Sequence, residues 1–198
     1  MRHAPYLRTD EHEEAVRSLE WAEIQARGLV GDPYLWKWVL IALHNAAQGF
    51  LVLALWDGNG LNTLQPRIAE KWLKAYENGG PFPAEKLDHF LSLYAKVKDS
   101  NNFHTVGAGP FISGTSSDWS LERLNEFRNT FTHFTPKGWS LELAGLPSIC
   151  LDTLNLIQFL GWESTAITWY RRIHQVRSRR ALKRLRSSLL SLKAANDA

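Results

Sequence analysis

The segment Val39–Trp56 constrains the fold most, because its 18 residues carry no charged side chain. A helix of this length and composition is long enough to cross the hydrocarbon core of a membrane. Three polar side chains interrupt it at i, i+1 and i+4, namely His44, Asn45 and Gln48. They share one side of the helix, where lipid would leave their hydrogen bonds unmade. We therefore expect a core helix and no membrane, with the polar stripe meeting a partner helix or a second subunit.

Composition favours one cytoplasmic domain without a cofactor. The chain has 198 residues, 44% of them apolar, which suffices for one sizeable core. Its single cysteine, Cys150, excludes an intrachain disulfide, and no basic segment followed by an apolar run opens the sequence. No His or Cys pair has the spacing of metal ligands, so we expect no metal.

The charge is unevenly distributed. The formal net charge is +3, yet residues 163–198 contain nine lysines and arginines against two acids, Glu163 and Asp197. This segment indicates a basic amphipathic helix, which either attracts an anionic partner such as nucleic acid or is a solvated surface helix. We divide the chain accordingly into a helical domain, residues 1–162, and a basic C-terminal helix, residues 163–198, packed on the same domain.

Apolar periodicity predicts an all-α bundle of about six to seven helices, and no segment has the pattern of a strand. Gly, Pro and capping residues set the expected boundaries. The residues from Asn101 to Ser117 are expected to form a long loop. The helices are expected at about 10–27, 32–56, 65–78, 83–98, 118–134 and 146–160, and from near Glu163 onwards.

The fifth expected helix, capped by Asp118 or Ser120, has two chemically different faces. Four apolar residues gather on the buried face, namely Leu124, Phe127, Phe131 and Phe134. A helical wheel places five polar side chains in a sector of roughly 140° opposite them. These are Asn125, Arg128, Asn129, Thr132 and His133. A guanidinium that can grip a phosphate and an imidazole that titrates near neutral pH suit phosphate chemistry.

Arg128 and His133 are five residues apart and therefore about 140° apart around the helix axis. They flank Asn129 and Thr132 rather than stacking on each other. A cleft across the helix, or a second copy of the same helix packed against it, would bring both to one phosphate.

The run Leu124-Asn125-Glu126-Phe127-Arg128-Asn129-Thr130-Phe131-Thr132-His133-Phe134 resembles the signature of the HEPN superfamily (higher eukaryotes and prokaryotes nucleotide-binding domain). That motif is Arg, a polar residue, three more residues, then His. The run Ile41-Ala42-Leu43-His44-Asn45-Ala46-Ala47 and the apolar stretch to Leu55 resemble another core helix of the family. The resemblance spans about Pro33 to Leu160, with Arg128, Asn129 and His133 as its motif-specific residues.

The resemblance implies a HEPN-like up-down bundle that forms homodimers through the motif helix and, in many members, a metal-independent endoribonuclease. His133 would then move a proton at the 2′-hydroxyl or leaving oxygen, Arg128 would stabilise the phosphorane, and Asn129 would orient the phosphate or His133. Members of the family also belong to toxin–antitoxin or defence systems, which implies a cognate antitoxin or regulatory protein. Thr135 stands where toxins modified by a nucleotidyltransferase have Tyr, so that modification is not expected.

Several alternatives stay open at this stage. The same residues fit a non-catalytic HEPN-like module that binds a nucleotide or a protein. His44 either adds a second imidazole to the site or is a hydrogen-bonded core residue, and Lys137 either borders the site or belongs to a helix-ending turn. Five tryptophans at helical positions are expected in the core or at a dimer contact, namely Trp21, Trp36, Trp38, Trp56 and Trp72.

Overall fold

The computed structural model describes residues 6–56, 58–133 and 138–196. Within these ranges the protein has seven α-helices and no strand, apart from one isolated bridge between Leu64 and Leu87. The predicted all-α bundle of six to seven helices is confirmed. The helices are α1 (Glu11–Ala26), α2 (Trp36–Leu55), α3 (Pro66–Asn78), α4 (Phe90–Lys96), α5 (Thr115–Thr132), α6 (Leu146–Gln158) and α7 (Arg172–Asn196).

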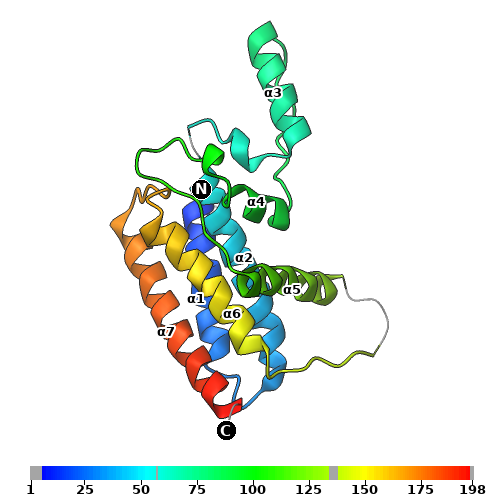
Figure 1. Cartoon of the computed structure of the whole chain (residues 1–198), viewed down its shortest axis with the longest axis vertical. Helices are drawn as coiled ribbons and strands as arrows, with labels where there is room; N and C mark the ends of the chain where they lie inside the picture. Colours follow the sequence, from blue (N-terminus) through cyan, green and yellow to red (C-terminus); the bar gives the residue numbers. More distant parts are fainter. Residues whose placement is uncertain (1–5, 57, 134–137, 197–198) are drawn as a thin grey trace, which may run out of the picture.

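Helix α2 is the centre of the bundle and contacts α1, α4, α5 and α6 (Figure 1). Together with the turn before it, α2 is long and apolar enough to cross a membrane, but 67% of its most apolar 18-residue window is buried inside the protein. Leu40, Leu43, Phe50 and Leu51 are fully buried. Of the polar stripe, His44 meets a partner helix as expected, because it contacts α5. Asn45 is exposed, and Gln48 is only partly buried.

Helices α1 and α2 approach closely at Gly49. A Cβ atom at this position would lie 2.7 Å from the Cβ and 3.0 Å from the Cα of Ala15 on α1. The side chain of Ala15 is buried as well. The two small residues therefore set the spacing of this helix pair.

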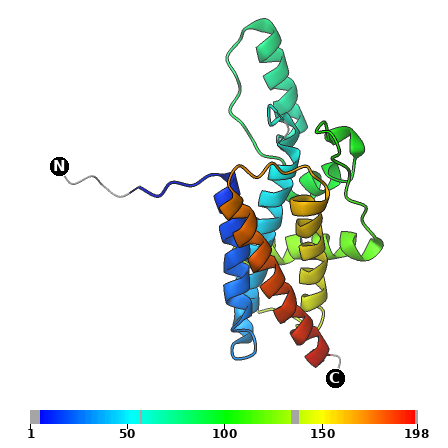
Figure 2. The ribbon, with the colours of Figure 1, turned by 90° about the vertical axis from the view of Figure 1, so that its left-hand side faces the viewer.

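Helix α7 packs against α1 and α6, and Figure 2 shows it running along α1. Leu182, Leu185 and Leu189 bury its apolar face. Arg177 adds a polar anchor: its guanidinium makes two hydrogen bonds to Glu20, at 2.8 and 2.6 Å, and another to Glu13 at 2.9 Å.

Helix α3 and its flanking segments project from the bundle in both views (Figures 1 and 2). None of the α3 residues is buried. The Trp72 ring stacks on Phe82 with centroids 4.4 Å apart and on Tyr76 with centroids 6.2 Å apart. This arm is thus held by its own aromatic contacts rather than by the core.

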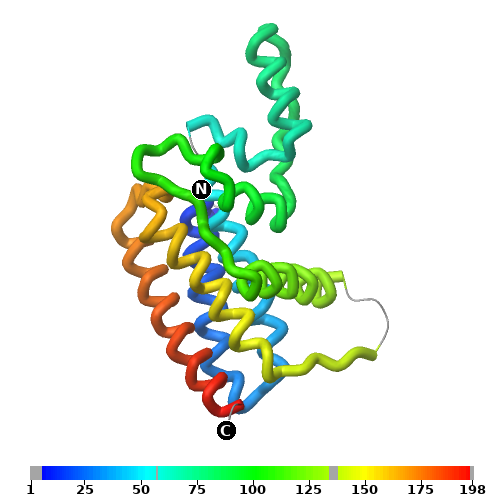
Figure 3. The backbone as a smooth tube through the Cα atoms, viewed as in Figure 1, coloured from blue at the N-terminus to red at the C-terminus, as the bar shows by residue number. Residues whose placement is uncertain are grey.

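The expected starts of the fourth and the last helix are wrong. The fourth helix begins at Phe90 rather than near Pro83, because Pro81 and Pro83 favour an extended backbone that runs to Leu87. The last helix begins at Arg172 rather than near Glu163. A π-turn follows α6, and an extended segment then leads to α7 (Figure 3).

The tryptophans divide between core and surface. Trp36 is buried and belongs to the core, whereas Trp21, Trp38 and Trp56 are about half exposed and Trp72 is half-buried. The three exposed rings are therefore not in the core, and a dimer contact for them stays a prediction. Trp21 and Trp38 lie on the exposed sides of α1 and α2, whose buried sides consist largely of Leu and Ala, and Trp56 follows the end of α2.

We expect Gly49→Val to lower the free energy of unfolding by about 2 kcal/mol, because the added side chain overpacks the contact with Ala15. Urea unfolding followed by circular dichroism measures this change. Gly109→Val is the control, since nothing lies within 4 Å of a Cβ there. An equal effect of both substitutions would contradict the close approach of α1 and α2.

Stability should fall in acid partly through Glu13. The hydrogen bond from Arg177 is the main cause that lowers the pKa of this carboxyl from 4.5 to about 2. The ionised Glu13 carboxylate therefore makes its full contribution to the stability of the folded state above pH 4.5. This contribution is lost as the pH falls towards 2.

Glu13→Gln should accordingly flatten the dependence of the unfolding free energy on pH between about 4.5 and 2. Urea titrations at several pH values test this. Glu70→Gln is the matched control, because the Glu70–Lys74 pair lies on the exposed face of α3. A Glu13→Gln variant that keeps the wild-type pH profile would refute the role of the Arg177 anchor.

Candidate functional site

Helix α5 is fixed to the bundle at its N-terminal half. The Ser120 hydroxyl donates a hydrogen bond of 2.7 Å to the Asp152 carboxylate on α6. Asp118 accepts hydrogen bonds from the Tyr94 hydroxyl at 2.8 Å and from the Lys98 ammonium at 2.9 Å. These contacts make α5 a rigid support for the residues that follow in its second half.

The predicted faces of α5 are confirmed in the described residues. Leu124 and Phe127 are buried, and Phe131 packs half-buried against the core, while Phe134 lies outside the described residues. The helix begins earlier than expected, at Thr115 with Gly114 as its N-cap. Asp118 is therefore not the cap but a residue of the first turn. A negative charge at this position is stabilised by the helix dipole.

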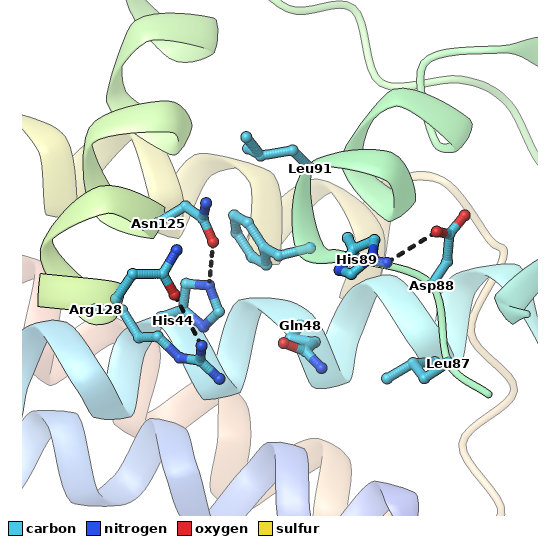
Figure 4. A pocket seen from close by; sticks show the side chains of 10 residues that line it. His44, Gln48, Leu87, Asp88, His89, Leu91, Asn125 and Arg128 are labelled. Atoms are coloured by element: carbon cyan, nitrogen blue, oxygen red, sulfur yellow. Dashed lines mark hydrogen bonds between the residues drawn. The ribbon is translucent and has the colours of Figure 1, made fainter. Parts of the chain in front are cut away.

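A cleft with a volume of about 440 Å³ opens between α2, α5 and the segment that leads into α4 (Figure 4). We call it the α2–α5 cleft. Helix α2 forms its floor, α5 one wall and the segment from Leu87 to Leu91 the other wall. Its lining residues are His44, Gln48, Leu87, Asp88, His89, Phe90, Leu91, Asn125, Arg128 and Asn129.

His44 lies at the bottom of this cleft and joins α2 to α5. Its side chain is 1% exposed, and its ring packs against Phe90 with centroids 4.1 Å apart. Its Nε2 lies 3.1 Å from the Oδ1 atom of Asn125. Burial lowers the pKa of His44 to about 4, so the imidazole is neutral at pH 7.

A neutral His44 donates its Nε2 proton to Asn125, because the amide oxygen can only accept. The Nδ1 atom is then an acceptor, and it is buried without a partner in the described part of the chain. With Oδ1 occupied, the Asn125 amide turns its NH2 group away from His44 (Figure 4). His44 thus fixes which end of the Asn125 amide faces a ligand.

Arg128 is oriented in a similar way. One terminal nitrogen of its guanidinium donates a hydrogen bond of 2.9 Å to the Oδ1 atom of Asn129. The other nitrogen donors of Arg128 and the NH2 groups of Asn125 and Asn129 are left for a ligand. Guanidinium and amide donors on one wall form a suitable environment for a phosphate.

The carboxylate in the cleft does not cancel this preference. Asp88 is buried and forms an ion pair of 2.7 Å with Lys96. It also accepts a hydrogen bond of 2.9 Å from the backbone N–H of His89. The charge of Asp88 is therefore balanced locally, whereas Arg128 on the opposite wall forms no ion pair with any of the residues that the structure describes.

The structure divides the predicted site into two parts. It brings Asn125, Arg128 and Asn129 together with His44, but neither Thr132 nor His133 lines the α2–α5 cleft. The Thr132 hydroxyl donates to the carbonyl oxygen of Arg128 at 2.7 Å.

His133 is the exposed C-cap of α5, with φ −109° and ψ 50°. Its backbone leaves the helical path there, so the helical wheel no longer gives its direction. Lys137 and Thr135 lie outside the described residues.

Sequence reasoning missed the second wall. The predicted helix at 83–98 includes Asp88 and His89, so it does not place them in a wall of the cleft. Gln48, on the floor of the cleft, is predicted only as part of the polar stripe of α2. The signal was present in the two prolines at 81 and 83, which favour an extended backbone before Phe90. No group of three or more His, Cys, Asp and Glu side chains that could hold a metal occurs in the described ranges.

The His44 imidazole should titrate far below the ordinary value for histidine. We expect a pKa of about 4 from the pH dependence of its NMR signals, assigned by comparison with His44→Gln. Because the pKa is lowered from 6.5, the neutral ring contributes stability above pH 6.5 that is lost as the pH falls through 4.

Asn125→Ala provides the check on this assignment. The hydrogen bond to Asn125 raises the pKa of His44 and so offsets part of the decrease caused by burial. Removal of this hydrogen bond should therefore lower the pKa further. Titration of His44 near 6.5 in the folded wild-type protein would show that the ring is not enclosed between α2 and α5.

No family model matches this chain, and no curated protein or solved structure matches it either. The side chains of the α2–α5 cleft themselves therefore have to indicate the function. Among these, the Arg128 guanidinium and the amide of Asn125 define the chemistry most clearly.

Proposed function

We propose that this protein is a HEPN-like RNA-binding protein that forms homodimers and cleaves RNA without a metal ion. The observation that carries the proposal is the open cleft in which Arg128, oriented by Asn129, adjoins an Asn125 amide fixed by His44. These groups are donors, and the nearby carboxylate of Asp88 is already paired with Lys96. A phosphodiester supplies the negative charge and the acceptor oxygens that such a site lacks.

Cleavage would use the 2′-hydroxyl of the RNA as the nucleophile. Its oxygen forms a bond to phosphorus, its proton passes to a base, and the bond from phosphorus to the 5′-oxygen breaks as that oxygen gains a proton. Arg128 would stabilise the charge on the pentavalent phosphorane. His133 is the candidate for proton transfer because it is exposed at the end of the same helix.

The position of His133 supports the proposed dimer. Within one chain this residue does not line the cleft, whereas Arg128 does. The second half of α5 presents exposed Asn129, Thr132 and His133. Two copies of α5 packed against each other would bring the imidazole of one chain to the Arg128 of the other.

A non-catalytic module that binds a nucleotide is the second candidate. It is favoured by the same observation that His133 lies outside the cleft, and by a volume of about 440 Å³, which is typical of small-molecule pockets. In either case we place the protein in the cytoplasm, under the control of a cognate antitoxin or other regulatory protein.

RNA cleavage in EDTA distinguishes the two candidates. We expect the purified protein to cut a mixed pool of single-stranded RNA. His133→Ala should reduce the rate at least 100-fold, as expected for a general acid or base, and Arg128→Ala at least 100-fold through loss of charge stabilisation. Gel electrophoresis of end-labelled RNA measures the rates.

Arg123→Ala is the matched control, since Arg123 lies on the same helix, pairs with Glu126 and does not line the cleft. This variant should keep the wild-type rate. Equal cleavage by wild type and both site variants would exclude the nuclease, and so would no cleavage by any of them. Binding of a nucleotide that needs Arg128 but not His133 would then support the second candidate.

A further inference from the structure

A second concentration of positive charge lies where α1 packs against α7. Two neighbouring hollows of about 310 and 330 Å³ follow this helix pair and share Arg27. We call them together the α1–α7 groove. Figure 2 shows the two helices that border it. No lining residue is shared with the α2–α5 cleft. The groove is therefore a separate surface feature.

The first hollow has more cations than acids. Glu23 is paired with Arg27 at 2.7 Å, and Glu20 accepts the two hydrogen bonds of Arg177. Arg180 and Arg184 also line this hollow, and both are exposed. Neither makes an ion pair within the described part of the chain. The hollow thus retains two uncompensated guanidinium groups.

The sequence of α7 adds repulsion to this excess. From Arg172 to Asn196 the helix contains no Asp or Glu. Arg180 and Arg184 are four residues apart and so are Arg179 and Lys183, and like charges at this spacing destabilise a helix. A solvated surface helix would gain stability from Asp or Glu residues placed four positions from its lysines and arginines. A bound anion would remove the repulsion between the cations, which would explain why α7 contains no such acids.

The second hollow is lined by serines on the same side of α7 as the arginines. The hydroxyls of Ser188 and Ser191 also donate to backbone carbonyls of α7. Ser187, Ser188 and Ser191 line it, and they continue the same side of α7. From Arg180 to Ser191 the helix rises by about 16 Å. Arginine and serine side chains arranged along a groove are typical contacts to successive phosphate and sugar groups of a nucleic acid strand.

We infer that the α1–α7 groove binds the sugar–phosphate backbone of single-stranded RNA, as a second contact for the ligand class of the proposed function, on which this inference rests. One strand fits because Arg180 and Arg184 lie about one turn apart on α7 and both line the groove between the two helices. A lipid surface fits less well because the arginines line a concave groove rather than flank an apolar face. The groove would hold a long RNA while the α2–α5 cleft engages one of its phosphates.

Binding of a fluorescein-labelled, 2′-O-methylated oligouridylate, which cannot be cleaved, to the full chain in EDTA tests the inference. Anisotropy is measured from about 50 to about 200 mM KCl. Replacing Arg180 and Arg184 together by Ser should weaken binding about tenfold at the lowest salt. The slope of log affinity against log salt should decrease by about 1.4, or 0.7 for each lost phosphate contact.

The double variant of Arg67→Ser and Lys71→Ser is the control, because it removes the same charge from exposed positions on α3. An equal loss in this control, or no loss in the groove variant, would overturn the inference. Binding to phosphatidylserine vesicles that requires Arg180 and Arg184, with oligouridylate binding unaffected, would overturn it too.

Arg128→Ala separates this inference from the proposed function. If oligouridylate binding is insensitive to Arg128 but weakened by the loss of Arg180 and Arg184, the proposed cleft fails and the groove stands. If binding depends on Arg128 alone, the groove fails and the proposed cleft stands.

Discussion

Burial of helix α2, which carries no charged side chain after Lys37, is the constraint on which the rest of the structure depends. Four helices pack around it, and the close contact of Gly49 with Ala15 sets the spacing of the first pair. A helix enclosed in this way can carry polar groups only where a neighbouring helix satisfies them. His44 meets this condition by bonding to Asn125, and the wall of the cleft is therefore tied to the core.

The contact between His44 and Asn125 connects stability to recognition. The imidazole is too deeply buried to be charged at neutral pH, so it acts as a neutral donor rather than as a cation. Its role is to position an amide, while the charge that attracts an anion comes from Arg128 one turn later. A site built from buried positioning groups and one partly exposed guanidinium is suited to binding, and cleavage requires a further proton-transfer group.

The sequence predicted the helical class, the buried α2 and the two faces of α5, because each depends on local periodicity over many residues. It did not predict that Asp88 and His89 form the opposite wall, since their position depends on the extended segment between α3 and α4. It also could not separate His133 from Arg128, because a helical wheel assumes a helix that continues past Thr132. The composition of α7 predicts a basic helix. Only the packed structure shows that Arg177 forms ion pairs with Glu13 and Glu20, while other cations of α7 remain exposed.

The most direct test of the central claim is an NMR titration of the full chain with a 2′-O-methylated RNA dinucleotide, which cannot be cleaved. We expect the side-chain N–H signals of Arg128 and Asn125 and the ring signals of His44 to shift in a saturable way. Signals of Arg123, on the same helix but outside the cleft, should stay in place. Saturating dinucleotide that leaves Arg128, Asn125 and His44 unshifted would contradict a phosphate site between α2 and α5.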